Sequence, residues 1–411
     1  MLVFYNLFIA LYYAVLRLLS FRNTKAKEWI RGRKNWRLLL QEGIGKHSKW
    51  VWVHCASAGE FEQGKPVIEL LKRHYPDYKV IITFFSPSGY GAGKKYKLAD
   101  HIAYIPLDTE SNAKDFLDIV NPELVIFVKY DYWYHFLKAT AKRRIPLLLV
   151  AAIFRTQQPF FQWYGSLHRE MLTFFTHLFV QDQESTSLLS TIGIKHCTVS
   201  GDTRFDRVAE ITSHFTSLPL IQEFVGSHRV LVAGSTWPDD ERLIRAAQSM
   251  LPGLKIIIAP HEIHKGHIDS IQAIFPDAVT YSQAEKVSLA DKNILIIDNV
   301  GMLSRLYHYA TITYIGGGFN KSGIHNTLEA AVWGKPVFFG PNFQKFKEAK
   351  ELVQQKAAYS IKESNELAEQ INILLNNQIL LQQASDSARN YVLKNVGATN
   401  LIHQFIRQNV F

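Results

Sequence analysis

Residues 54–64 combine small side chains with a carboxylate, Glu60, in a pattern that suits acid–base chemistry. They follow an apolar run, residues 50–53, that predicts a buried strand, and they precede a helical pattern beginning near Val67. In doubly wound α/β folds, such strand-to-helix turns lie at the carboxyl edge of the sheet, where ligands bind. Glu60 is therefore a candidate general base. The alternative is that Glu60 only caps the following helix, since acidic residues favour first turns.

A second candidate site lies in the C-terminal half, where three predicted strands end in polar turns. The strongest turn covers residues 316–331, with three consecutive glycines, a loop, and a helix expected to begin near His325 or Asn326. Glycines let a ligand touch the backbone, a helix start binds phosphate, and Glu329 could accept hydrogen bonds from a ribose diol. The candidate ligand-binding residues of the three turns are Ser235, Thr236, Pro260, His261, Gly316, Gly317, Gly318, His325, Asn326 and Glu329.

The other two turns leave alternatives open. Ser235 and Thr236 precede a helix start, so their hydroxyl groups could donate to a phosphate or simply cap the helix. His261, His264 and His267 recur at every third position, which invites a metal site. The spacing lacks the pattern in which two imidazoles and a base converge on zinc. We therefore expect polar ligand contacts there and no metal.

Alternating strand and helix patterns predict two similar α/β halves. Short runs rich in Val, Ile and Phe alternate with helical patterns such as residues 112–120 and 134–143. This alternation is typical of mainly parallel sheets covered on both faces. The predicted strands are residues 51–54, 80–85, 124–128, 147–153 and 178–180, then 230–233, 255–259, 294–297, 311–315 and 336–339.

The composition favours two domains and an anionic partner. The chain has 411 residues, too many for one ordinary core, and its hydrophobic fraction of 47% fits a globular protein. Two cysteines, Cys55 and Cys197, lie far apart in sequence, which argues against a disulfide scaffold or a cysteine zinc site. The net charge of +10 indicates phosphate, nucleic acid or a membrane surface as a partner.

The N-terminus predicts a membrane anchor. Residues 1–16 are almost wholly apolar, and positive charge follows them, whereas a signal peptide carries its charge first. Tyrosine and basic residues match headgroup depth and anionic lipid, so we expect this segment to lie in the interface or to insert into the bilayer from the cytoplasmic face. A buried N-terminal helix is the alternative. The basic belt comprises Arg17, Arg22, Lys25, Lys27, Arg31, Arg33, Lys34 and Arg37.

Five segments make the chain similar to a known family. They are the N-terminal anchor, the turn ending in Gly59-Glu60-Phe61, residues 201–206, the turn at Gly234 and residues 323–329. On these segments the chain resembles the 3-deoxy-D-manno-octulosonic acid (Kdo) transferases of lipid A assembly. The resemblance implies an α/β GT-B fold, in which two Rossmann-like domains enclose a central cleft behind an N-terminal anchor helix. The expected parts are the anchor (1–22), the acceptor-binding domain (23–210), the nucleotide-sugar-binding domain (211–385) and a C-terminal helix packing back on the first domain (386–411).

The resemblance also implies roles for residues of the first domain. Glu60 matches the presumed catalytic base, with Glu62 as the acid next in line. Asp131, with Trp133, matches the family's acid before Leu-Trp-Pro-Asn, although the acid here is shorter and the proline is missing. The residues expected to bind the acceptor are Ser57, Gly59, Arg31 and Arg33.

In the second domain the match is mixed. The family's Pro-Arg-His-Pro corresponds to residues 260–263, where the arginine is absent. Its His, Asn and Glu stand at His325, Asn326 and Glu329, so the resemblance implies nucleotide-sugar binding at that turn.

The implied activity is an inverting transfer of Kdo from CMP-Kdo to a lipid A precursor (lipid IVA) at the cytoplasmic face of the inner membrane. The resemblance implies no cofactor and no metal, with CMP-Kdo, the lipid A precursor and inner-membrane lipid as partners and no nucleic acid. The alternatives are another GT-B nucleotide-sugar transferase or a UDP-sugar epimerase, which would need no anchor. A membrane-bound nucleic-acid-binding module is a remote alternative suggested by the charge alone.

Overall fold

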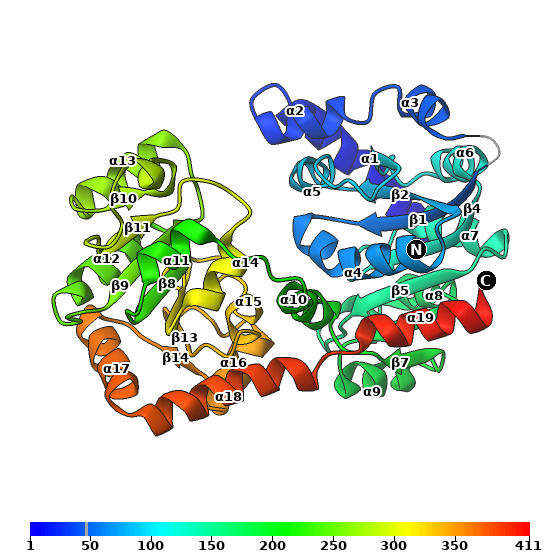
Figure 1. The fold of residues 1–411 in the computed structure, drawn as a ribbon. Helices are drawn as coiled ribbons and strands as arrows, with labels where there is room; N and C mark the ends of the chain where they lie inside the picture. Colours follow the sequence, from blue (N-terminus) through cyan, green and yellow to red (C-terminus); the bar gives the residue numbers. More distant parts are fainter. Residues whose placement is uncertain (46–47) are drawn as a thin grey trace. The chain divides into compact units, whose positions relative to one another are not determined.

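The computed structural model describes residues 1–45 and 48–411 of the chain, which forms two compact units (Figure 1). Unit 1 comprises Met1–Arg207 and Val396–Phe411, and unit 2 comprises Val208–Asn395. The first division lies beside the predicted boundary after residue 210, and the second lies after residue 395, later than the predicted 385. Each unit contains one sheet of seven parallel strands covered by helices.

The sheet of unit 1 has the strand order β3-β2-β1-β4-β5-β6-β7. The chain winds outward from β1 to β3 and then returns to the other side of β1, so the strand order reverses between β1 and β4. Such a reversal is the topological switch point at which α/β proteins bind ligands. The strands are β1 (Lys49–Cys55), β2 (Tyr78–Phe84), β3 (His101–Tyr104), β4 (Pro122–Val128), β5 (Leu147–Ala152), β6 (His177–Val180) and β7 (Cys197–Val199).

Both faces of this sheet are buried, which explains the near-continuous apolar strands. Val51 and Val53 of β1 face one core, with Phe61 of the helix that follows, whereas Trp52 faces the other and lies 4.6 Å from the ring of Phe116. The helices of the core around Val51 and Val53 are α4 (Ala58–His74) and α19 (Ala398–Asn409). Those of the core around Trp52 are α3 (Trp36–Gly43), α6 (Glu110–Val120), α7 (Tyr134–Lys142), α8 (Ser166–Thr173) and α9 (Gln183–Thr191).

The sheet of unit 2 repeats the design with the order β10-β11-β9-β8-β12-β13-β14, so its switch point lies between β8 and β12. Helices α12 (Pro238–Gln248), α13 (Lys265–Ile274) and α17 (Ser364–Asn376) cover one face of it. The strands are β8 (Val230–Thr236), β9 (Lys255–Pro260), β10 (Val279–Thr280), β11 (Ile294–Ile296), β12 (Ile312–Ile315), β13 (Val337–Phe339) and β14 (Ala358–Ser360).

The α/β fold class and all ten predicted strands are confirmed. The four strands that the sequence did not reveal, β3, β7, β10 and β14, are the edge strands of the two sheets. They have two to four residues each, and β7 is partly exposed throughout. An edge strand pairs on one side and is covered less fully, so it needs no long apolar run.

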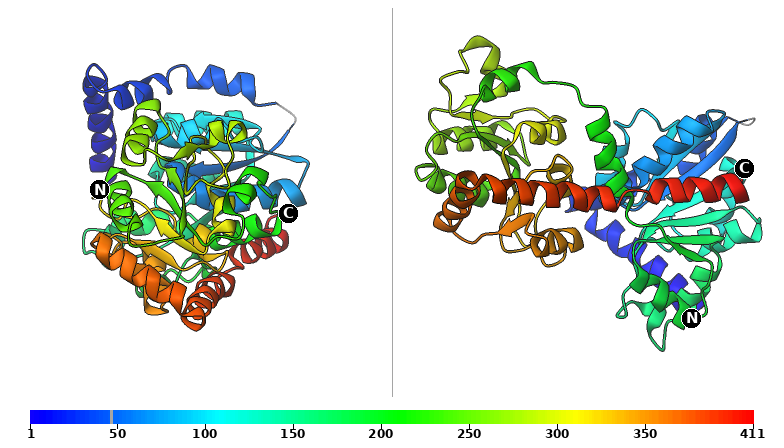
Figure 2. Two further views of the ribbon diagram at one scale, coloured as in Figure 1. Left: turned by 60° about the vertical axis from the view of Figure 1, so that its left-hand side comes forward. Right: turned by 60° about the horizontal axis from the view of Figure 1, so that its bottom comes forward.

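The C-terminal helix predicted over residues 386–411 is divided in the structure between the end of α18 (Gln378–Lys394) and α19. Gly397 has φ +129°, which ends the first helix before the second begins. Asp206 accepts hydrogen bonds from the backbone N–H groups of Gly397 (2.7 Å) and Thr399 (3.0 Å), so its carboxylate satisfies the start of α19. Helix α19 packs against α4 of unit 1 (Figures 1 and 2).

Helix α1 (Leu2–Leu19) leaves most of its surface exposed at the periphery of unit 1 (Figure 2). By length and composition it is apolar enough to cross a membrane, and 6% of it is buried. Its opposite face contacts the rest of unit 1. The Tyr5 hydroxyl donates to Asp108 at 2.5 Å, and His135 Nε2 lies 2.7 Å from the Asn6 side-chain oxygen. The exposed apolar residues are Val3, Phe4, Leu7, Phe8, Leu11, Val15, Leu18 and Leu19.

The remaining helices complete the two units and their connections. They are α2 (Thr24–Arg31), α5 (Pro87–Gly93), α10 (Thr203–Ser213), α11 (Pro219–Val225), α14 (Leu303–Leu306), α15 (Leu328–Ala331) and α16 (Lys347–Gln354), with short 3₁₀ turns at Pro159–Phe161, Tyr281–Lys286 and Tyr307–Tyr309.

Candidate active site

The turn after β1 carries Glu60 into the first turn of α4. Ser57 is the N-cap of this helix, and its hydroxyl oxygen accepts from the Gly59 N–H at 3.3 Å while the hydroxyl donates to the Glu60 carboxylate. Glu60 is half-buried, so solvent and a substrate can both reach it. The structure therefore brings three predicted residues, Ser57, Gly59 and Glu60, together at the switch point. Capping and base chemistry are compatible here, because Ser57 supplies the cap.

Asp131 lies at the end of the neighbouring strand and is held by a buried hydrogen-bond chain. His54 Nε2 lies 2.9 Å from Asp131 Oδ2, and His54 Nδ1 lies 2.9 Å from the Thr83 hydroxyl. A carboxylate oxygen only accepts, so Nε2 carries the proton and Nδ1 accepts from Thr83. The same Asp131 oxygen accepts from the indole N–H of Trp133 at 3.2 Å. Two ring donors thus fix the orientation of this carboxylate.

The two carboxylates share one electrostatic environment. Cys55 ends β1 opposite Val128 of β4, and burial together with the negative charges of Glu60 and Asp131 raises the pKa of its thiol well above the ordinary value. Both acids must lie near the end of β1 for this effect. Cys55 is fully buried and stays a neutral thiol, so it serves packing and not nucleophilic chemistry.

The segment 201–206, part of the family resemblance, holds α4 in place. Asp202 is buried and accepts from the Gln63 amide at 3.1 Å, while the Thr203 hydroxyl donates to the Gln63 carbonyl at 2.6 Å. Burial alone would raise the pKa of Asp202, but the charge of Arg204 and its hydrogen bonds lower it, so the carboxylate stays ionised. Because Gln63 lies one turn after Glu60, this motif is a positioning element for the candidate base.

Sequence reasoning missed two residues beside these acids. Tyr130 follows β4, and burial raises the pKa of its phenol; the positive charge of Arg155 opposes this, and the negative charge of Glu60 adds to it. Arg155 follows β5, and its guanidinium donates to Asp182 at 3.3 Å and to the Phe154 carbonyl at 2.8 Å. A cation placed soon after a buried strand was the signal that could have revealed Arg155.

The two arginines predicted to bind the acceptor differ in exposure. Arg31 is exposed at the end of α2, and its acceptor contact stays a prediction. Arg33 is 9% exposed, and its guanidinium donates to the carbonyls of Ile105 (2.9 Å), Trp29 (3.1 Å) and Phe85 (2.8 Å). Burial lowers its pKa to about 9. The prediction that Arg33 faces headgroup or acceptor with the rest of the basic belt is wrong, because three backbone carbonyls and the Trp29 ring occupy it.

In unit 2 the three consecutive glycines lie where backbone segments of neighbouring turns pack closely together. A Cβ on Gly316 would lie 2.2 Å from the Ser235 carbonyl oxygen, and one on Gly318 would lie 2.4 Å from the Gly340 nitrogen. Gly317 has φ +90°, and its N–H donates to Asp240 at 2.9 Å. The glycines therefore let neighbouring backbone segments approach one another. The predicted contact between the glycine backbone and a ligand cannot use the Gly317 N–H, because Asp240 accepts from it.

Buried acids occupy the start of α12. Asp240 accepts from the Tyr314 hydroxyl at 2.7 Å and the Trp237 N–H at 2.9 Å, and burial raises its pKa. The Thr236 hydroxyl is fully buried and donates to Glu241 at 2.9 Å. The prediction that Thr236 donates to a donor phosphate is therefore wrong. Ser235, half-buried with φ +53°, stays a candidate.

An aromatic cluster lines this end of the sheet. The indole N–H of Trp237 donates to His325 Nε2 at 3.0 Å, and the rings of His261 and His325 stack with centroids 4.3 Å apart. Burial, with the charge of His261, lowers the pKa of His325 to about 4. His325 is therefore neutral at pH 7 and carries its proton on Nδ1, which leaves one N–H donor for a ligand. Pro260 is buried next to the exposed His261.

The last predicted turn ends in a shorter helix than expected. Helix α15 begins at Leu328, not near His325 or Asn326, and has four residues, so little helix dipole is available for a phosphate. The Asn326 side chain satisfies the start of this helix. Its oxygen accepts from the Leu328 N–H at 3.1 Å, and its amide donates to Glu329 at 3.0 Å. Asn326 thereby orients the Glu329 carboxylate.

Among the described residues, no group of three metal-ligating side chains converges. His267 Nε2 lies 3.1 Å from the buried carboxylate of Glu241, and its Nδ1 lies 2.8 Å from the Glu262 carbonyl. His264 is the exposed N-cap of α13. The three histidines of residues 261–267 thus have separate partners.

Two doubly wound sheets with polar turns at both switch points define the GT-B class of nucleotide-sugar enzymes. Solved structures with this fold include UDP-GlcNAc 2-epimerase from Neisseria meningitidis bound to UDP-GlcNAc (TM-score 0.60, 18% identity, 88% of this chain and 100% of that one). MurG from Acinetobacter baumannii is also similar (TM-score 0.55, 15% identity, 88% and 99%).

The family is more specific than the fold. The family model for 3-deoxy-D-manno-octulosonic-acid transferase (kdotransferase) matches residues 32–207. The 3-deoxy-D-manno-octulosonic acid transferase of Rickettsia bellii is 27% identical over 369 residues, which cover 86% of this chain and 87% of the relative. The chain is similar to this family of glycosyltransferases over most of its length.

Proposed function

We propose that the protein transfers Kdo from CMP-Kdo to a hydroxyl group of a lipid A precursor. The observation that carries this proposal is the Glu60 carboxylate, half-buried at the switch point of unit 1 inside the segment that the family model matches. An ionised carboxylate at such an edge can take a proton from an alcohol.

The proposed step is a single displacement. Glu60 takes the proton of the acceptor hydroxyl while its oxygen attacks the anomeric carbon of Kdo. The bond from that carbon to the phosphate oxygen of CMP breaks, and CMP leaves with the electron pair, so the configuration inverts. Ser57 releases its hydrogen bond to Glu60 as the carboxylate accepts the substrate proton. Asp131, oriented by His54 and Trp133, offers its second oxygen to hold the acceptor.

Unit 2 supplies groups suited to the nucleotide of the donor. Glu329, oriented by Asn326, would accept from the ribose hydroxyls, and neutral His325 would donate from Nδ1 to the phosphate. Ser235 and His261 lie at the neighbouring strand ends. We propose that no metal takes part, because these neutral donors stabilise the phosphate charge in place of a cation.

We further propose that α1 holds the protein on the cytoplasmic face of the inner membrane by lying in the interface. Its exposed side is almost wholly apolar, whereas Tyr5 and Asn6 bond to Asp108 and His135 on the other side. A helix crossing the bilayer would carry its first residues away from these partners, so in-plane attachment fits the contacts better.

The deciding assay incubates the full-length protein with CMP-Kdo and lipid IVA in detergent and determines the mass of the lipid product. A mass increase of one or more Kdo residues is expected, and UDP-GlcNAc in place of CMP-Kdo should give none. An unmodified lipid with CMP-Kdo, or 2-epimerisation of UDP-GlcNAc, would contradict the proposal and favour the epimerases that share the fold.

A further inference from the structure

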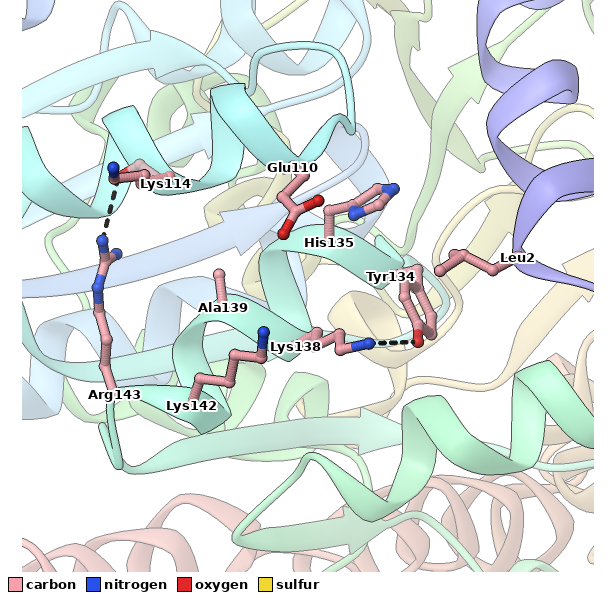
Figure 3. Close-up of a pocket in the computed structure, with 9 residues that line it drawn as sticks. All are labelled: Leu2, Glu110, Lys114, Tyr134, His135, Lys138, Ala139, Lys142 and Arg143. Carbon is pink, nitrogen blue, oxygen red and sulfur yellow. Dashed lines mark hydrogen bonds between the residues drawn. The ribbon is translucent and has the colours of Figure 1, made fainter.

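A pocket of about 310 Å³ lies on the outside of unit 1, lined by residues of α6 and α7 (Figure 3). It lies outside the cluster of Glu60 and Asp131 and has no part in the proposed step. The first residue of α1, Leu2, forms part of its wall. The pocket therefore adjoins the helix that we place in the membrane interface.

The lining is strongly basic. Lys114, Lys138, Lys142 and Arg143 contribute four cations against the single carboxylate of Glu110. Figure 3 shows the Lys142 ammonium group and the Glu110 carboxylate turned toward the same space. Four positive charges beside one negative charge leave an excess that favours an anion.

Two of the cations are fixed by the fold. Lys138 donates to the Tyr134 hydroxyl at 3.1 Å, and this hydrogen bond raises the pKa of its ammonium group. Arg143 donates from Nη2 to the Lys114 carbonyl and bonds to Asp118. Its Nη1 atom is buried and has no hydrogen-bond partner.

The lining of the pocket is also partly apolar. Leu2, Ala139 and the ring of Tyr134 contribute this apolar surface, interspersed with the cations, and the next residues of α1, Val3 and Phe4, are 77% and 75% exposed. An anion-binding site thus opens beside a helix face that is suited to lipid tails. This gradient from charge to hydrocarbon matches a phospholipid at the membrane surface.

We propose that this pocket holds the phosphate headgroup of an anionic bilayer phospholipid and so fixes unit 1 on the membrane. The inference rests on the membrane attachment proposed for α1. A bilayer lipid fits better than the acceptor, because the pocket has room for a phosphoglycerol headgroup and lies apart from the candidate base. Lipid binding here positions α1 and leaves the chemistry unchanged.

The test measures lipid retained by the detergent-solubilised full-length protein in native mass spectrometry. The probes are phosphatidylglycerol, phosphatidylcholine, inorganic phosphate and lipid IVA. We expect the wild type to retain phosphatidylglycerol in preference to phosphatidylcholine. The variant K114Q/K138Q/K142Q should bind phosphatidylglycerol about tenfold or more weakly, since each lysine near an anionic lipid contributes severalfold.

The control variant K286Q/K350Q/K362Q removes three exposed lysines of unit 2 and should retain lipid like the wild type. If the pocket variant does not fold, the single change Lys142→Gln at an exposed side chain replaces it, with a severalfold loss expected. Unchanged phosphatidylglycerol retention in a folded pocket variant would overturn the inference. Displacement of the lipid by inorganic phosphate would indicate a free-phosphate site, and displacement by lipid IVA an acceptor site; either result overturns it too.

Kdo transfer in detergent is measured on the same preparations. Loss of lipid retention with normal transfer supports the pocket and leaves the proposed activity intact. Absence of transfer in a wild type that still retains phosphatidylglycerol would refute the activity alone.

Discussion

The imidazole of His54 lies 2.9 Å from the carboxylate of Asp131 and connects it to the interior of the sheet. The other ring nitrogen accepts from the Thr83 hydroxyl at 2.9 Å, and the oxygen of that hydroxyl accepts from the indole N–H of Trp52 at 2.7 Å. His54 and Thr83 are fully buried and come from adjacent strands. The orientation of Asp131 therefore depends on core residues that no substrate touches, which makes His54 and Thr83 positioning residues.

Replacing Thr83 with Val tests this chain. The change keeps the shape but removes the proton that His54 Nδ1 accepts, so His54 can adopt the wrong tautomer and release Asp131. We expect the transfer rate to fall about tenfold or more, because small errors of placement are costly in catalysis. Steady-state kinetics with CMP-Kdo and lipid IVA measure it.

The matched control is Thr140→Val, which removes a buried hydroxyl that donates to the Phe136 carbonyl at 2.8 Å. Thr140→Val loses about 1 kcal/mol of unfolding free energy from one lost hydrogen bond. Thr83→Val loses more, because two bonds break and the indole N–H of Trp52 is left without an acceptor, so the comparison is made on the rate at equal folded fraction. If both variants then lose rate alike, Thr83 has a structural role only.

Replacing Glu60 with Gln should lower the transfer rate by about 10²–10⁴-fold, because an amide cannot take up the acceptor's proton. Donor affinity and the melting temperature should stay close to those of the wild type, since Ser57 supplies the cap of α4. Glu62→Gln is the control: Glu62 is exposed and pairs with Lys65, so its loss should leave the rate nearly unchanged. A Glu60 variant that keeps more than about a tenth of the rate would assign the base elsewhere.

The sequence was sufficient to predict the strands that are buried on both faces, because such strands are continuously apolar. Central strands such as β1 and β4 read as apolar runs, and the polar residues after them, Glu60 and Asp131, then fall at the switch point. It was not sufficient at the edges, because β7 and β14 are three residues long and partly exposed.

Roles that depend on three-dimensional partners also escaped the sequence. Arg33 belongs to a basic belt in sequence, yet its side chain reaches carbonyls at residues 85 and 105. Thr236 resembles a residue that donates a hydrogen bond to phosphate, yet its hydroxyl donates to Glu241. In each case the deciding partner lies on a different turn or helix, which local patterns do not encode.

Replacing Glu329 with Gln should weaken binding of CMP-Kdo. The variant keeps the hydrogen-bonding shape but loses the charge that strengthens bonds from the ribose hydroxyls, about 1.5–3 kcal/mol per bond. Asn326 would still orient the side chain, so the fold should change little. Isothermal titration calorimetry with CMP measures the loss. An unchanged affinity would remove Glu329 from the nucleotide site.

Protonation of His325 should lower stability in acid. Its pKa is about 4 in the folded protein against an ordinary 6.5, because burial and the charge of His261 disfavour the imidazolium. As the pH falls through 6.5 toward 4, the unfolded chain binds a proton that the folded chain does not, so the free energy of unfolding decreases.

The measurement compares wild type with His325→Gln in denaturant titrations at pH 7.5 and pH 5. The variant cannot titrate at this position, so its free energy of unfolding should fall less between the two pH values. Equal decreases would show that His325 is not held neutral by the fold.

The attachment of α1 to the membrane is testable without disturbing its contacts with unit 1. Phe4, Leu7, Phe8 and Leu11 are exposed, so replacing them with serine removes apolar surface while Tyr5 keeps its bond to Asp108. Each side chain contributes about 1.5–3 kcal/mol when buried in hydrocarbon, so four serines should release the protein from membranes in high salt. Deleting residues 1–20 should also release it, with folding largely kept.

The control for this experiment replaces exposed apolar residues elsewhere, Val300→Ser with Ile379→Ser, and should leave the protein bound to membranes. Orientation is read from Val3→Cys, labelled in sealed inner-membrane vesicles of known sidedness. A helix in the interface leaves this cysteine reactive from the cytoplasmic side, as the contacts of Tyr5 require, whereas a spanning helix exposes it on the opposite side. Labelling from the opposite side alone, or sedimentation of the serine variant with membranes in high salt, would contradict the interfacial anchor.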